Sequence, residues 1–301
     1  MTIQQILRDK SMLKYMAPLD RELLLSYVLK KPREYIFAHP EKKLSASQFK
    51  KFKNLANRRA KGEPIAYLTG KKEFYGLEFS VNRNVLIPRP ETELLVELVL
   101  KNIQNTKHKI RNTSIIDIGT GSGNIIIAII KNIPEKMARN AKFFAIDISE
   151  KALEVARANA KKHKVDKKIK FTQSDLLKFI YKNKLKGNLI IIANLPYVSP
   201  QMYREHKENL RFEPKRALVS GKGGVSHYIR LIGEIGELWK SEQFRTISVF
   251  FEISPEQKGA LLKIIQKELP SAKVHFFKDL SGKIRVAKIE FDPPPTLFNF
   301  R

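Results

Sequence analysis

From residue 114 onward, short apolar segments that favour strands alternate with longer segments that favour helices. The expected strands are 114–118, 142–146, 169–172, 189–193 and 246–252, and the expected helices are 124–130, 149–163, 226–239 and 255–269. This alternation predicts an α/β fold, in which helices cover a doubly wound parallel sheet. Segments 274–277 and 284–289 have no helix between them and should close the sheet as a hairpin. The proline-rich tail at 292–295 should leave the fold.

The buried strand 189–193 runs into Asn194, Leu195, Pro196 and Tyr197. Ligands of open α/β sheets bind beyond the carboxyl ends of the strands. The Asn194 side-chain oxygen and the Leu195 carbonyl are two acceptors that can hold both hydrogens of a planar –NH2 group, and Pro196 keeps Leu195 extended. Tyr197 offers a flat face to such a group. An ordinary strand end closed by an Asn-Pro turn explains these residues equally well.

A glycine-rich turn joins the first of these strands to its helix, and it consists of Gly119, Thr120, Gly121, Ser122 and Gly123. Its glycines permit a tight turn and let a ligand approach the backbone. Asp147 ends the next strand, where an acidic side chain can accept hydrogen bonds from ribose hydroxyls. The G-x-G-x-G spacing favours S-adenosylmethionine over a pyrophosphate cofactor. The alternative is that Asp147 caps the following helix, a role that Ser149 can fill as well.

The first 70 residues have the apolar spacing of helices. One helix is expected at 19–29 with Asp20 as its N-cap, and another at 44–60 with Ser45 or Ser47 as its cap. Segment 74–87 alternates as a β-hairpin does, with its turn at 82–84, and a helix is expected at 91–103. These patterns predict three parts: an N-terminal helical domain at 1–70, a β-hairpin linker at 71–90 and a larger domain at 91–301.

The composition of the chain indicates the cellular compartment and the partners to expect. The chain has no cysteine, which excludes disulfides and thiolate zinc sites and agrees with a reducing cytosol. We find neither a signal-peptide core nor an apolar run long enough to cross a bilayer, so we expect a cytoplasmic protein. The six histidines lack metal spacing, and we assign them no role. The lysines are spread through the whole chain, so we favour a compositional origin for most of the net charge of +27, although proximity to RNA or the ribosome would fit.

Several motifs together carry a family resemblance. The glycine turn, Asp147 and Asn194-Leu195-Pro196-Tyr197 resemble signatures of S-adenosylmethionine-dependent amino-methyltransferases. Segments 62–70, 73–77 and 86–93 are similar to the linker of the HemK/PrmC family, the peptide chain release factor glutamine N5-methyltransferases. The resemblance covers nearly the whole chain. Three positions depart from the family pattern: Leu195 replaces the usual Pro, Gly223 the usual Asp, and Leu176 a Trp found in some members.

The resemblance implies a Rossmann-like class I methyltransferase sheet and a reaction. The methyl group of S-adenosylmethionine would pass to the side-chain nitrogen of the glutamine in the Gly-Gly-Gln motif of class I release factors, with no metal. By resemblance, the cofactor is bound by Gly119, Thr120, Gly121, Ser122, Gly123, Asp147, Leu176 and Asn194. Catalysis and substrate binding fall to Asn194, Leu195, Pro196 and Tyr197. For Arg89 and Glu91 we favour structural roles, a connector salt bridge and a charge at a helix N-terminus.

Three alternatives stay open. An adenine-N6 methyltransferase acting on RNA or DNA would use the same two acceptors, and both Leu195 and the basic charge favour it. A related glutamine methyltransferase acting on a ribosomal protein would share the core. A non-catalytic RNA-binding factor would be expected if the glycine turn or Asn194 had been lost, but both are present.

Overall fold

The computed structural model describes residues 1–9, 16–105 and 112–291. The chain divides into two compact units, Met1–Lys71 and Lys72–Arg301. The tail at 292–295, which we expected to leave the fold, lies outside the described residues.

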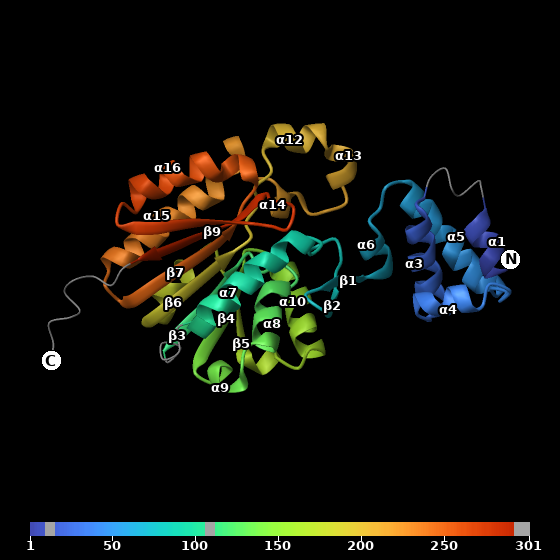
Figure 1. Ribbon diagram of the computed structural model, residues 1–301, viewed down its shortest axis with the longest axis horizontal. Helices are drawn as coiled ribbons and strands as arrows, with labels where there is room; N and C mark the ends of the chain where they lie inside the picture. The colour runs from blue at the N-terminus through green and yellow to red at the C-terminus, as the bar shows by residue number, and fades with distance from the viewer. Residues whose placement is uncertain (10–15, 106–111, 292–301) are drawn as a thin grey trace. The chain divides into compact units, whose positions relative to one another are not determined.

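The N-terminal unit is helical (Figure 1). Its helices are α1 (Ile3–Arg8), α3 (Pro18–Leu29), α4 (Arg33–Ala38), α5 (Ala46–Ala60) and α6 (Ile65–Thr69). Ser45 caps α5 as predicted, in a capping box with Gln48. The predicted cap at Asp20 is wrong, because α3 begins two residues earlier at Pro18, whose ring favours the first helical position. Asp20 instead accepts a hydrogen bond from Arg59 at 2.8 Å.

The linker contains a hairpin, but its turn is not where the sequence pattern placed it. Strands β1 (Lys71–Phe74) and β2 (Leu77–Ser80) flank Tyr75 and Gly76, which both have positive φ. Two such residues make the tight turn whose twist suits a hairpin. The predicted turn at 82–84 is therefore wrong. Residues 81–89 contain neither helix nor strand and lead to the short helix η1 (Pro90–Thr92).

The larger unit is built on a seven-stranded sheet with the order β5-β4-β3-β6-β7-β9-β8 (Figure 1). The strands are β3 (Thr113–Ile118), β4 (Ala141–Asp147), β5 (Ile169–Gln173), β6 (Gly187–Ala193), β7 (Phe244–Glu252), β8 (Ala272–Lys278) and β9 (Ile284–Phe291). The first five are parallel, and β9 runs antiparallel to both β7 and β8. The predicted parallel sheet with a closing hairpin is confirmed.

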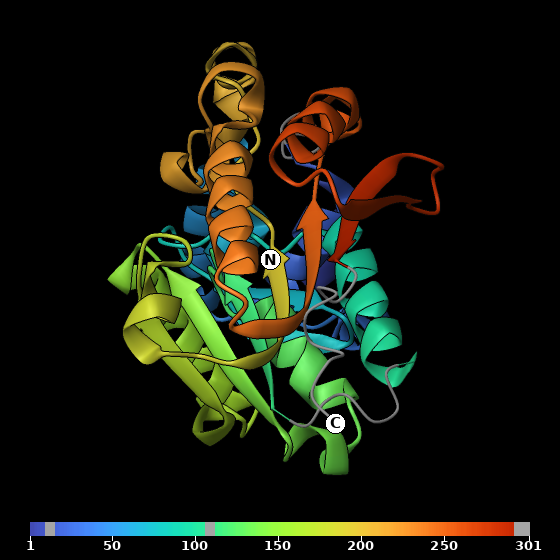
Figure 2. The same ribbon diagram turned by 90° about the vertical axis from the view of Figure 1, so that its left-hand side faces the viewer.

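Helices cover both faces of this sheet, as the two views in Figures 1 and 2 show. On one face lie α7 (Glu93–Asn105), α8 (Asn124–Asn132), α9 (Glu135–Ala138) and α10 (Glu150–Lys162), and on the other α11 (Lys178–Asn183), α15 (Ser226–Lys240) and α16 (Lys258–Glu268). In β6, Leu189 and Ile191 enter one core and Ile190 and Ile192 enter the other. This two-sided burial explains why the strand is apolar at every position from 189 to 193.

Shorter helices complete the larger unit. They are η2 (Asp166–Lys168), α12 (Pro200–Glu205), α13 (Lys207–Leu210), α14 (Lys215–Leu218), η3 (Lys222–Gly224) and η4 (Pro255–Gln257). None of the described helices is long and apolar enough to cross a membrane.

The strand order creates a switch point between β3 and β6. The chain moves outward from β3 to β4 and β5, then returns to place β6 on the other side of β3. The loops that leave β3 and β6 therefore diverge, which opens a crevice at the carboxyl ends of these strands.

Candidate active site

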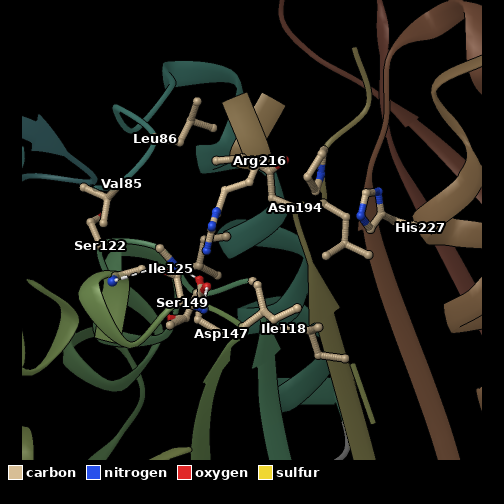
Figure 3. Close-up of a pocket in the computed structure, with 18 of the residues that line it drawn as sticks. Val85, Leu86, Ile118, Ser122, Ile125, Asp147, Ser149, Asn194, Arg216 and His227 are labelled. Atoms are coloured by element: carbon tan, nitrogen blue, oxygen red, sulfur yellow. Dashed lines mark hydrogen bonds between the residues drawn. The ribbon is translucent and has the colours of Figure 1, made fainter. Parts of the chain in front are cut away.

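A pocket lies at this switch point (Figure 3). Its floor comes from the loops after β3, β4, β5 and β6, and its remaining wall comes from the linker and from the segment that carries α14 and α15. The residues that line it include 84–89, Thr92, 118–122, Asp147, Ser149, 174–176, 194–196, Arg216, His227 and Arg230. All these residues belong to the larger unit.

Asp147 ties the glycine turn to the start of α10. One carboxylate oxygen accepts the Gly121 N–H at 3.0 Å and the other accepts the Ser149 N–H at 2.9 Å. Ser149, and not Asp147, is the N-cap of α10, because its hydroxyl accepts the Ala152 N–H. Burial raises the pKa of Asp147, against the opposing effect of these hydrogen bonds and of the Arg216 charge. Asp147 also lines the pocket, and each of its oxygens has a further lone pair that can accept a hydrogen bond from a ligand.

The glycine turn fits closely under the pocket. A Cβ atom at Gly119 would lie 3.2 Å from the Leu195 side chain, and its φ of +70° disfavours any other residue. Gly123 does not line the pocket; it caps α8, where a Cβ would lie 3.2 Å from Ala156 on α10. The other four residues of the turn do line the pocket, so the structure brings them together with Asp147 and Leu176.

A second carboxyl lies under the same turn. Asp117 is fully buried and accepts a hydrogen bond from the Thr120 hydroxyl at 2.7 Å. Its other oxygen, Oδ1, has no hydrogen-bond partner among the described residues. Burial raises the pKa of Asp117 to about 7, and the Asp147 charge adds to this rise. Asp117 does not line the pocket, whereas Asp147 does, and the Asp147 carboxylate favours a cationic ligand such as S-adenosylmethionine, which carries sulfonium and ammonium groups.

We expect Asp117→Asn to change how stability depends on pH. The unfolded chain releases the Asp117 proton near pH 3.8, and the folded chain holds it until about 7. Wild type therefore loses folding stability as the pH rises between these values, while the variant has no such proton to release. Relative to wild type, the variant should gain roughly 3 kcal/mol in unfolding free energy from pH 4 to pH 7. Urea unfolding without cofactor measures this difference, and a constant difference would contradict it.

Asn194 reaches the pocket with a defined orientation. Its side-chain nitrogen donates to Glu252 Oε2 at 3.0 Å and to Thr92 Oγ1 at 3.3 Å. The side-chain oxygen therefore faces away from these two partners, and Asn194 contributes to the pocket wall (Figure 3). At Leu195, the backbone N–H is bound to the Tyr228 hydroxyl. The Leu195 carbonyl is consequently the backbone group of this residue that can bind a ligand.

The Tyr197 ring does not lie in the pocket wall, where we expected it to offer a flat face to the substrate. It is half-buried, packs against the apolar core, and is not among the residues that line the pocket. Burial raises the pKa of its hydroxyl to about 12. The expected flat face for a substrate is therefore not part of this pocket wall, because the tyrosine ring is used in core packing.

The linker supplies a wall that sequence reasoning did not assign to the site. Buried Glu213 accepts the Ile87 N–H at 3.1 Å and forms an ion pair with Arg89, so it holds residues 85–89 over the pocket. This confirms the structural role expected for Arg89. Ile87 and Glu213 are 126 positions apart in the sequence, so only the fold shows that they meet.

Two further pocket residues were missed. The Arg216 side chain extends from α14 toward Asp147 (Figure 3). His227, one of the histidines to which we assigned no role, lines the pocket and shares a hydrogen bond of 2.8 Å with Ser220. The sequence did not indicate this position of His227, because distance in sequence from the motifs does not measure distance in the fold. Among the described residues, no group of three or more acidic or histidine side chains could hold a metal ion.

The sheet order, the glycine turn and the acidic tip of β4 define a class I S-adenosylmethionine-dependent methyltransferase. In agreement, a methyltransferase domain model matches residues 109–266. The catalytic domain of hMettl16 has the same fold, with a TM-score of 0.55 and 16% identity over 80% of this chain and 83% of that one.

The particular family follows from the full-length comparison. A PrmC N-terminal domain model matches residues 7–70. The chain is 35% identical to the release factor glutamine methyltransferase of Dictyoglomus turgidum, over 90% of each chain, and 35% identical to that of Bacillus subtilis, over 88% of each. The chain belongs to the release factor glutamine methyltransferase family.

Proposed function

We propose that this protein transfers the methyl group of S-adenosylmethionine to the side-chain nitrogen of the glutamine in the Gly-Gly-Gln motif of class I release factors. The observation that carries the proposal is the orientation of Asn194, whose oxygen is turned toward a pocket that suits a cationic cofactor. Membership of the family, along almost the whole chain, supports the substrate.

An amide nitrogen is a poor nucleophile because its lone pair is delocalised into the carbonyl. Asn194 Oδ1 and the Leu195 carbonyl would accept the two amide hydrogens, which localises the lone pair and directs it toward the cofactor. Such positioning can contribute roughly 7–11 kcal/mol. The same acceptors stabilise the positive charge that develops on the nitrogen. Bound S-adenosylmethionine supplies the electrophilic methyl group, and Asp147, Leu176 and the glycine turn would hold it.

The outer parts of the chain have supporting roles in this proposal. The helical domain at 1–70 helps to hold the release factor, the hairpin linker at 71–90 joins it to the methyltransferase domain at 91–301, and the reaction takes place in the cytoplasm. The net charge of +27 supports proximity to ribosomes, where release factors work.

The substrate is tested by incubating the protein with methyl-labelled S-adenosylmethionine and, separately, an unmethylated class I release factor, ribosomal proteins and ribosomal RNA. We expect label on the release factor, and none on a release factor whose motif glutamine is replaced by alanine. Label only on a ribosomal protein would indicate the related glutamine methyltransferase activity. Label only on RNA adenine, the outcome that Leu195 and the charge would favour, would overturn the protein substrate.

A further inference from the structure

Glu252 occupies the tip of β7, directly beside the tip of β6 that carries Asn194. The two strands are parallel neighbours with Ala193 opposite Phe251, so the next residues of each strand come together. The Glu252 side chain is buried, with 3% of its surface exposed. A buried carboxyl group is costly to ionise. Because this one lies next to Asn194, whose oxygen would hold the substrate amide, it is a candidate for a role in the reaction.

The hydrogen bonds around Glu252 have a definite direction. An ionised carboxylate can only accept, so it accepts from the Asn194 amide at 3.0 Å and from the Thr92 hydroxyl. Thr92 Oγ1 can then accept the second amide hydrogen of Asn194 at 3.3 Å. Both hydrogens of Asn194 are thus used by Thr92 and Glu252, which leaves its oxygen as the group available to a ligand. In the reverse orientation the Asn194 oxygen would face the Glu252 carboxylate, and two acceptors repel each other.

We propose that Glu252 is a positioning residue, whose ionised carboxylate fixes the Asn194 amide with its oxygen toward the substrate nitrogen. A protonated Glu252 has a hydrogen to donate, and the Asn194 oxygen can then turn to accept it. The Asn194 –NH2 would face the substrate –NH2, and two donors repel each other. This inference rests on the proposed function in one respect, namely that the substrate group is the –NH2 of a glutamine side chain.

Several charged groups surround Glu252. Burial is the largest influence and raises its pKa to about 7; Glu91 raises it further, whereas Arg285 and Arg89 lower it. Tyr197 is also close, and its own pKa is raised by Glu252. The Tyr228 hydroxyl donates to the Glu252 backbone carbonyl, which holds the strand tip. The orientation of Asn194 should therefore change within the physiological pH range.

Methylation rates at saturating cofactor and release factor test this dependence. In wild type, kcat should rise about tenfold per pH unit below about pH 7 and then level off. We call the fall of kcat below about pH 7 the acidic limb. Glu252→Gln keeps an acceptor for Asn194 but does not titrate, so the acidic limb should be absent from its pH profile. Glu91→Gln should move the limb to lower pH, because it removes a charge that raises the pKa of Glu252. Glu252→Leu should lower kcat about 100-fold and leave the cofactor Kd within about threefold.

Glu256→Gln is the matched control. Glu256 is exposed on η4, four residues from Glu252, and its replacement should leave the acidic limb in place. An unchanged limb in Glu252→Gln, or no displacement in Glu91→Gln, would overturn the inference even if Glu252→Leu fails to fold.

A spectroscopic measurement separates this inference from the substrate assignment. The side-chain –NH2 resonances of Asn194 in 15N-labelled protein, assigned through Asn194→Ala, should titrate near pH 7 in wild type and not in Glu252→Gln. This needs no release factor, so failure to methylate a release factor would overturn the proposed function alone. Asn194 resonances that do not change with pH in wild type would overturn the role of Glu252.

Discussion

Asn194→Ala is expected to lower methyl transfer to the release factor by at least about 100-fold, as the loss of one preorganised group at a developing charge does elsewhere. The variant removes the oxygen that the structure turns toward the pocket, and it also removes the donor to Glu252 and Thr92. It leaves the glycine turn and Asp147 in place. Cofactor affinity should therefore change little, which calorimetry with S-adenosylmethionine or S-adenosylhomocysteine can measure alongside turnover.

Asn132→Ala provides a control for the loss of an asparagine side chain. Asn132 is the last residue of α8, and within the described part of the chain its side chain donates to the backbone carbonyl of Ala128 in the same helix. This variant should keep wild-type turnover. Unchanged turnover in Asn194→Ala would remove the proposed catalytic site, whatever the behaviour of the control.

Asp147→Ala should weaken cofactor binding by roughly 10- to 100-fold, the effect of losing one or two hydrogen bonds to a charged group. Two changes contribute: the carboxylate is no longer available to the ribose hydroxyls, and the Gly121 and Ser149 N–H groups lose their acceptor. Calorimetry with S-adenosylhomocysteine gives the affinity directly. Turnover at saturating cofactor should recover substantially, because Asp147 does not contact the acceptors at Asn194 and Leu195.

Asp147→Asn distinguishes the two contributions. Its single side-chain oxygen can support one of the two backbone N–H groups, so the turn should be less disturbed than in the alanine variant, and the loss of affinity should be intermediate. Equal affinity in Asp147→Ala and wild type would mean that the ribose contact is wrongly assigned.

Local sequence patterns predicted much of the fold. Alternating apolar runs and amphipathic segments specified the seven strands and the longer helices of the larger unit, because buried parallel strands need apolar residues on both faces. The short helices α9 and α11–α14 were not predicted. The capping box at Ser45 and the glycine turn at 119–123 were also predictable, since each depends on residues a few positions apart. The hairpin turn was misplaced because Tyr75 has no visible preference for the positive φ that it adopts.

The sequence by itself determined the seven strands of the larger sheet, its longer helices and the residues that end the strands carrying the site, because those are short-range properties of the chain. Only the tertiary structure decided which way Asn194 points, since its partners Thr92 and Glu252 are 102 and 58 residues away. The same holds for Glu213 over the linker and for Arg216 beside Asp147. Hydrogen-bond direction depends on which groups meet in space, and the packing of strands from distant parts of the chain brings them together.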